Sequence, residues 1–201
     1  MSLLFAMCLF AFSMSISPGP VNIITLSTGV NYGLKKSMSF VGGATIGFTL
    51  LLLTVGLGLR VIAEISEDIL VILSYVGSIF IAYMGTKIIL SAGNAESLSS
   101  SQQNIPTFWD GFLLQWLNPK AWIACISGVS AFNLGHSLPL LSIFICIYFL
   151  ICYISIASWA LLGDKLQTLL SSPSHFKIFN VTMGGALITV ACYLLYLQIV
   201  S

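Results

Sequence analysis

The segment SISPGPVNII, residues 15–24, interrupts an otherwise apolar stretch with two prolines, a glycine, two serines and an asparagine. Proline has no amide hydrogen and its ring clashes with the preceding turn, so Pro18 and Pro20 leave the carbonyls of Met14 and Ile16 without helical partners. Other groups must bind those carbonyls. The sequence therefore predicts that the first membrane helix is broken here into two half-helices.

A second break of the same kind lies about a hundred residues further on, in LNPKAWI at residues 117–123. Ser17-Pro18 and Asn118-Pro119 each place a good N-cap residue directly before a proline, which is favoured at the first position of a helix. The amides that begin each new half-helix would suit a carboxylate, and the carbonyls that end each preceding half would suit an ammonium. A zwitterionic amino acid carries both groups.

The composition around these breaks is that of a membrane protein. Hydrophobic residues make up 58% of the 201 residues and charged residues 6%, and the mean hydropathy is +1.03. The net charge of +1 excludes nucleic acid as a partner. The five cysteines form no CxxC pair, and no HExxH motif, Ser/His/Asp set or P-loop is present. The sequence therefore predicts no enzyme, no metal site and no cofactor.

Six apolar stretches are each long enough to cross about 30 Å of hydrocarbon, which takes roughly 20 helical residues. We expect all six to be helices, because a lipid-facing segment must satisfy its own backbone hydrogen bonds. The first stretch lacks the basic start and the cleavage site of a signal peptide, so we expect it to remain in the mature protein. The stretches are residues 3–30, 38–63, 69–90, 112–132, 138–163 and 178–200. The predicted fold class is an all-α integral membrane protein.

The polar segment 95–107 divides the chain into two halves of three spans, residues 1–94 and 108–201. Pro18 and Pro119 occupy matching places in the first span of each half. Because each half has three spans, the second half would enter the membrane from the opposite side. The sequence thus predicts two inverted three-helix repeats with broken first and fourth helices, as in many secondary transporters. The alternative is that the match of Pro18 with Pro119 does not indicate a repeat, because any two membrane helices that contain proline can be aligned.

The lysines of the loops predict the orientation of the chain. They follow the first, third and fifth spans: Lys35, Lys36, Lys87, Lys165 and Lys177. By the positive-inside rule these loops are cytoplasmic, so both termini and the remaining loops lie outside. The polar segment between the halves is then a cytoplasmic linker.

Lys120 follows the second break and lies about 12 Å inside the membrane boundary on this topology. A lysine there costs on the order of 3 kcal/mol, and no carboxylate lies within any predicted span to pair with it. Lys120 either binds or gates a substrate, or it extends to the headgroups and orients the span. Asn22 has two interpretations as well, a contact with substrate or an interhelical hydrogen bond.

The predicted substrate-binding and gating residues cluster at the two breaks. They are Ser17, Pro18, Gly19, Pro20, Asn22, Gln115, Asn118, Pro119 and Lys120. Small residues spaced by four, including Gly43 and Gly47, are typical of close helix packing. One face of the fifth span either walls a cavity or packs in the core or against lipid: Tyr148, Cys152, Ser155 and Trp159.

The breaks and their neighbours resemble the lysine exporter (LysE/RhtB) family of bacterial amino-acid efflux proteins, over essentially the whole chain. The motifs that carry the resemblance are SPGPVNI at 17–23, GLKKS at 33–37, GGATIGF at 42–48 and FLLQWLNPKAW at 112–122. PGP alone is a weak signal, whereas PGP in the first span together with NPK opening the fourth is specific. Within the family the sequence is most similar to the cysteine and O-acetylserine exporters.

The resemblance implies a multi-pass protein of the bacterial inner membrane that exports an amino acid or a close derivative, driven by the proton gradient. The motif residues carried over are Pro18, Gly19, Pro20, Asn22, Gly43, Gly47, Asn118, Pro119 and Lys120. Proton coupling meets a difficulty, because the predicted spans contain no carboxylate. Lys120 or the substrate amine would have to carry the proton.

We therefore predict a secondary transporter that exports a small amino acid by alternating access. Its partners would be a small zwitterionic substrate and the lipid bilayer, and a homodimer suits a chain this short. A membrane channel or a non-transporting membrane assembly subunit is the alternative. A pore would need a polar stripe along whole helices, and a scaffold would have no reason to keep the lysine and both breaks.

Overall fold

The computed structural model describes residues 2–62, 67–91, 105–170 and 172–200, and every regular element among them is a helix. In chain order the elements are α1 Leu3–Ile16, α2 Pro20–Tyr32, α3 Leu34–Ile62, α4 Glu67–Ser91, α5 Phe108–Trp116, α6 Pro119–Ala131, the short 3-10 helix η2 Leu134–His136, α7 Leu138–Leu169 and α8 Pro173–Val200. The prediction of an all-α fold is confirmed for these residues.

Three helices of the described part are long and apolar enough to cross a membrane: Leu34–Gly58 within α3, Leu138–Leu169 and Pro173–Leu197 within α8. The pair α1 and α2, bent by 60° at its break, adds a fourth if it is one span. The chain is thus a multi-pass helical membrane protein. The six spans in two inverted repeats stay a prediction.

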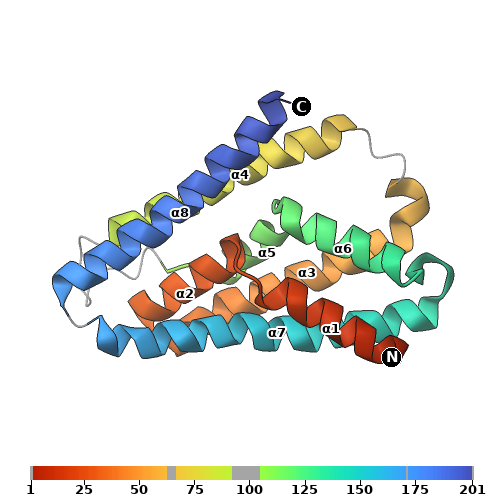
Figure 1. Cartoon of the computed structure of the whole chain (residues 1–201), viewed down its shortest axis with the longest axis horizontal. Coiled ribbons are helices and arrows are strands. Elements are labelled where there is room, and N and C mark those ends of the chain that lie inside the picture. Colours follow the sequence, from red (N-terminus) through yellow and green to blue (C-terminus); the bar gives the residue numbers. More distant parts are fainter. Residues whose placement is uncertain (1, 63–66, 92–104, 171, 201) are drawn as a thin grey trace.

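The helices pack in two groups (Figure 1). α7 runs along α1, α2 and α3, and α3 also packs against α5 and α6. α4 and α8 lie side by side and cross this group at an angle. The two breaks therefore lie inside the larger group, against α3 and α7.

Glycines allow the closest helix contacts. A side chain at Gly43 or Gly47 of α3 would run into the backbone of α5, at Phe108 and Phe112 respectively. Close packing of this kind fixes α5, and with it the second break, against α3.

Both breaks are present, although the helix bounds differ from the predicted spans. The fourth predicted span is two helices, since α5 ends at Trp116 and α6 begins at Pro119. Most of the predicted linker, residues 95–104, lies outside the described residues. Its last residue, Thr107, instead caps α5: Thr107 Oγ1 accepts from the amide of Asp110 at 3.3 Å, and the Thr107 amide donates to Asp110 Oδ2 at 2.7 Å.

Candidate functional site

The carbonyls left free at the first break have found side-chain donors. Ser17 Oγ donates to the carbonyl of Met14 at 3.1 Å. Trp159 Nε1 of α7 donates to the carbonyl of Ile16, also at 3.1 Å. These are the two carbonyls for which the prolines require other partners. Trp159 thereby ties the end of α1 to α7.

The predicted N-cap of the second half-helix is wrong by two residues. α2 begins at Pro20 and its N-cap is Gly19, which provides no side-chain hydrogen bond. Ser17 instead ends α1, with extended backbone (ψ 140). The helical region is disfavoured for a residue before a proline, and Gly19 has an extended backbone, so the helix starts only after it. Pro18 therefore lies in the break.

The second break follows the prediction more closely. Asn118 is the N-cap of α6 and Pro119 is its first residue. Asn118 Oδ1 accepts a hydrogen bond from the amide of Lys120 at 3.1 Å. The start of α6 is thus a capped helix terminus with a partial positive charge.

Asn22, in the first turn of α2, forms hydrogen bonds across the first break. Its Nδ2 donates to the carbonyl of Ser15 at 2.8 Å and to the carbonyl of Ser17 at 2.9 Å. The residue is only 3% exposed, and its Oδ1 has no hydrogen-bond partner among the described residues. An acceptor that is buried without a donor disfavours the unliganded structure and favours a ligand that brings an N–H group.

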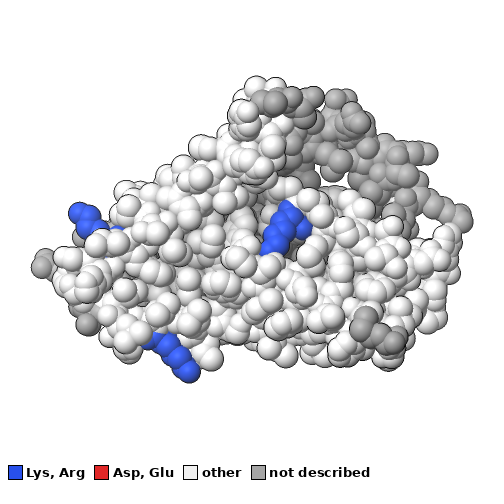
Figure 2. Space-filling model, in the orientation of Figure 1, with Lys and Arg blue, Asp and Glu red and all other residues white. Residues whose placement is uncertain are grey.

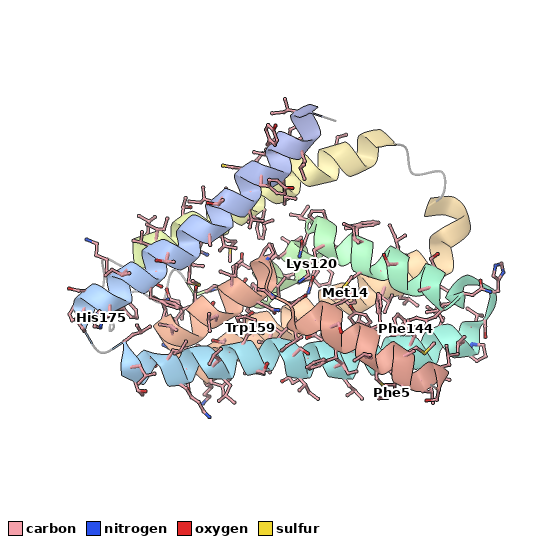
Figure 3. All side chains as sticks on the ribbon, in the orientation of Figure 1. Phe5, Met14, Lys120, Phe144, Trp159 and His175 are labelled. Carbon is pink, nitrogen blue, oxygen red and sulfur yellow. The ribbon has the colours of Figure 1, made fainter. Side chains whose placement is uncertain are left out.

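Lys120 connects the two breaks (Figure 3). Its Nζ donates to the carbonyl of Ser17 at 3.0 Å, to Ser17 Oγ at 2.8 Å and to the carbonyl of Pro18 at 3.3 Å. A basic side chain is visible in a hollow at the middle of the face in Figure 2, where Figure 3 places Lys120. The ammonium of α6 therefore occupies the carbonyl end of α1.

A cavity of about 420 Å³, counting its open mouth, lies between the breaks. Six of the nine predicted site residues line it: Gly19, Pro20, Asn22, Gln115, Asn118 and Lys120. Ser17 and Pro18 do not line it but contact the ammonium of Lys120. Pro119 starts α6 and is not a lining residue.

Other walls of the cavity are mostly apolar. They include Phe48 of α3 and three residues of α7, Tyr148, Cys152 and Ile156. The rings of Phe48 and Tyr148 are stacked with centroids 4.4 Å apart. Tyr148 and Cys152 belong to the α7 face predicted from sequence. Phe48 was missed, because one aromatic residue in an apolar span carries no distinguishing signal.

Small residues of α6 leave this space open. Ala121 and Ala124 line the cavity, as does Ser15 of α1. Ser15 Oγ is buried and lies beside Tyr148 and Cys152 of α7. Serine next to the first break could have been found from sequence, since it flanks the SPGP motif. The alanines could not, because alanine is common throughout membrane helices.

The cavity has one positive charge among its described lining residues. Lys120 is the one formally charged group among its described lining residues. No group of three His, Cys, Asp or Glu that could hold a metal ion occurs in the described part of the chain. The site therefore offers carbonyl and amide acceptors, one cation and a helix terminus, which together match the two ends of a zwitterion.

Comparisons with known proteins agree with the resemblance seen in the sequence. The sequence model of the LysE type translocator family matches residues 12–198. Proteins named "Cysteine/O-acetylserine efflux protein" from Escherichia coli O139:H28 (strain E24377A / ETEC), Escherichia coli (strain K12) and Shigella sonnei (strain Ss046) are each 27% identical to this chain over 199 aligned positions. Each alignment covers 97% of this chain and 98% of the relative. No solved structure matches the chain significantly.

The family match extends over both breaks and almost the whole described structure. It identifies a transport protein rather than an enzyme, and the resemblance to the LysE/RhtB family is confirmed. The chain belongs to the family of LysE type translocators.

Proposed function

We propose that this protein exports a small zwitterionic amino acid, of the class of cysteine or O-acetylserine, across the bacterial inner membrane. The observation that carries the proposal is the contact of Lys120 with the carbonyls of Ser17 and Pro18. A substrate ammonium has the same chemistry as the lysine ammonium and needs the same acceptors. The names of the similar efflux proteins support this substrate class.

An amino acid can insert into this contact without leaving a charge unpaired. Its ammonium takes the carbonyls of Ser17 and Pro18, and its carboxylate pairs with the Lys120 ammonium that it displaces. The nearby start of α6, capped by Asn118, adds a partial positive charge for the carboxylate. Asn22 Oδ1 accepts an N–H of the substrate ammonium and thereby gains the partner that it lacks.

The substrate side chain would face the apolar part of the cavity. Phe48, Tyr148 and Cys152 form this wall, and Ala124 leaves room for a few atoms. A charged side chain would find no opposite charge among the described lining residues other than Lys120, which already binds the carboxylate. The site therefore favours small neutral amino acids.

Alternating access is supported by the way the halves pack. α3 of the first half packs on α5 and α6, and α7 of the second half packs on α1 and α2. Each half thus places an unbroken helix against the broken helix of the other, as expected for halves related by a two-fold axis in the membrane plane. Rocking of the halves would open the cavity to one side at a time.

The energy source and setting complete the proposal. We infer that export is coupled to the proton gradient. Lys120 is the charged group at the binding site and would carry the proton. Both termini lie outside the cytoplasm if the loop lysines are cytoplasmic. Assembly as a homodimer stays a prediction of the sequence.

Exchange of radiolabelled L-cysteine across proteoliposomes tests the function. Under reducing conditions, we expect unlabelled cysteine inside to accelerate the uptake of labelled cysteine, because a carrier reorients faster with substrate bound. Lys120→Met should exchange no faster than protein-free liposomes, since it cannot pair with the carboxylate. Lys177→Met changes an exposed lysine of α8 in the same way and should keep the wild-type rate.

The outcomes separate the alternatives. Wild-type exchange by Lys120→Met would refute the proposed site. Flux that internal substrate fails to accelerate would indicate a channel instead of a carrier. No flux with any of a panel of neutral amino acids would leave the assembly subunit as the better description.

A further inference from the structure

Three phenylalanine rings meet beyond one end of the cavity. Phe10 belongs to α1, Phe132 follows the last residue of α6, and Phe144 belongs to α7. The centroid of the Phe10 ring lies 5.7 Å from that of Phe132 and 6.3 Å from that of Phe144. The centroids of Phe132 and Phe144 are 5.4 Å apart. These three rings are called the phenylalanine cluster below.

The cluster lies between the cavity and one end of the helices. Phe10 precedes the cavity residue Met14 by four positions, which places it one turn, about 6 Å, further from the first break. Phe144 precedes the cavity residue Tyr148 by the same interval. Figure 3 shows Phe144 beyond Met14 as seen from Lys120. The loop lysines predict that this end of the helices faces outside, so the cluster lies on the route from the cavity to the outside.

The rings of the cluster close this route. A Cβ atom at Gly128 of α6 would lie 3.0 Å from both Phe10 and Phe144, so these rings rest directly on the helix backbone. Phe144 is 0% exposed, and the three rings do not line the cavity themselves. A zwitterion that entered such a contact would lose its water without gaining hydrogen bonds, which is strongly unfavourable.

The contacts of the cluster are of a kind that can part and form again. Phenylalanine rings form no hydrogen bonds that would have to break, and edge-to-face pairs such as Phe10 with Phe132 add only modestly to the burial of their area. Phe10 comes from the first half of the chain, whereas Phe132 and Phe144 come from the second half. Rocking of one half against the other would therefore pull Phe10 away from the other two rings.

Tyr148 connects the cluster to the cavity. Its ring stacks on Phe48 with centroids 4.4 Å apart, and both residues line the cavity. Its other neighbour is Phe144, whose ring it meets edge-on with centroids 5.5 Å apart. Because protein interiors are close-packed and transmit strain, a substrate that displaces Tyr148 also displaces Phe144.

We propose that the phenylalanine cluster is the outer gate of this transporter, closed in this structure, and that Tyr148 transmits the occupancy of the cavity to it. The inference rests on the proposed function, because a gate requires a transported substrate. Once the rings part, water enters the gap and the substrate can leave, since hydrophobic constrictions open and close by wetting and dewetting.

Cross-linking across the cluster tests the gate. In a chain without the native cysteines, the substitutions Phe10→Cys and Phe132→Cys provide one thiol from each half for a short bismaleimide. After excess reagent is removed, the linked protein should no longer exchange radiolabelled L-cysteine in proteoliposomes, because the two halves cannot part. It should still bind L-cysteine in equilibrium dialysis. Each single-cysteine variant is its own control and should exchange equally before and after treatment.

The outcomes distinguish the gate from the proposed function. Exchange by the linked protein at the rate of the unlinked protein would overturn the gate and leave the proposed function standing. Failure of the wild type to exchange any neutral amino acid would overturn both.

A milder variant guards against misfolding of the double-cysteine protein. Phe144→Leu removes the ring contacts but keeps an apolar side chain. In a chain that retains only Cys152, which lines the cavity, a membrane-impermeant methanethiosulfonate added to the outside of spheroplasts should label Phe144→Leu about tenfold faster than its parent. Phe40→Leu changes an equally buried phenylalanine of α3 and should leave the rate unchanged. Equal labelling rates in the two variants would overturn the gate.

Discussion

Replacing Asn22 with leucine separates the stability of the first break from its ability to bind substrate. The change removes the Nδ2 donor from the carbonyls of Ser15 and Ser17. Ser17 keeps Lys120 as a donor, so only the Ser15 carbonyl loses its side-chain partner. A buried polar group without a partner costs about 1–3 kcal/mol.

The same substitution removes a cost of similar size. Asn22 Oδ1 is itself buried without a donor, and leucine of nearly the same shape has no such atom. The two contributions oppose each other, so we expect the free energy of unfolding of Asn22→Leu to change by less than about 1.5 kcal/mol. Thermal unfolding in detergent measures this change.

Substrate binding has no such compensation. In the proposed complex Asn22 Oδ1 accepts from the substrate ammonium, and hydrogen bonds to charged groups contribute about 1.5–3 kcal/mol. The affinity for L-cysteine at the Lys120 site should fall roughly 10- to 150-fold. Thr25→Val is the matched control, because Thr25 is equally buried, donates to the carbonyl of Val21 in its own helix and does not line the cavity.

Two results would refute this reasoning. Wild-type affinity in Asn22→Leu would show that the free oxygen is not a substrate ligand. Destabilisation by more than about 3 kcal/mol would show that the hydrogen bonds from Asn22 Nδ2 to the two carbonyls stabilise the fold by more than the unpaired Oδ1 destabilises it.

The remaining predictions concern the break and the packing around it. The double variant Pro18→Ala, Pro20→Ala regains two amide donors for helical bonding, so it should melt at a higher temperature and lose cysteine exchange; exchange at the wild-type rate would contradict a substrate role for the break. Gly43→Ala should lower the free energy of unfolding by about 1–3 kcal/mol, because its methyl group meets the Phe108 carbonyl. Gly42→Ala is the control, since no heavy atom lies within 4 Å, and equal melting temperatures of the two variants would count against this packing.

The breaks could be predicted from sequence because proline acts on its own neighbourhood. The missing amides of Pro18 and Pro20 require the carbonyls of Met14 and Ile16 to find other donors, and the structure shows those donors. The same local rule, applied to each residue before a proline, would have corrected the N-cap from Ser17 to Gly19.

Tertiary partners could not be predicted in this way. That Lys120 reaches the end of α1, or that Trp159 binds the Ile16 carbonyl, depends on the rotation of each helix about its axis. One sequence does not determine those rotations. The polar residues of α2 are different, since their spacing of three is visible in the sequence and indicates one polar stripe that winds around the helix: Asn22, Thr25, Thr28 and Asn31.

The contact between Lys120 and the carbonyls of Ser17 and Pro18, in the break after α1, also bears on the membrane potential. Backbone carbonyls that converge inside a membrane are a binding site for small cations such as sodium, potassium or hydronium. A covalently attached ammonium on those carbonyls repels such ions whenever no amino acid is bound. In the proposed exporter, the ammonium would therefore keep such ions off the binding site, and a cell could hold many copies of the protein without discharging its ion gradients.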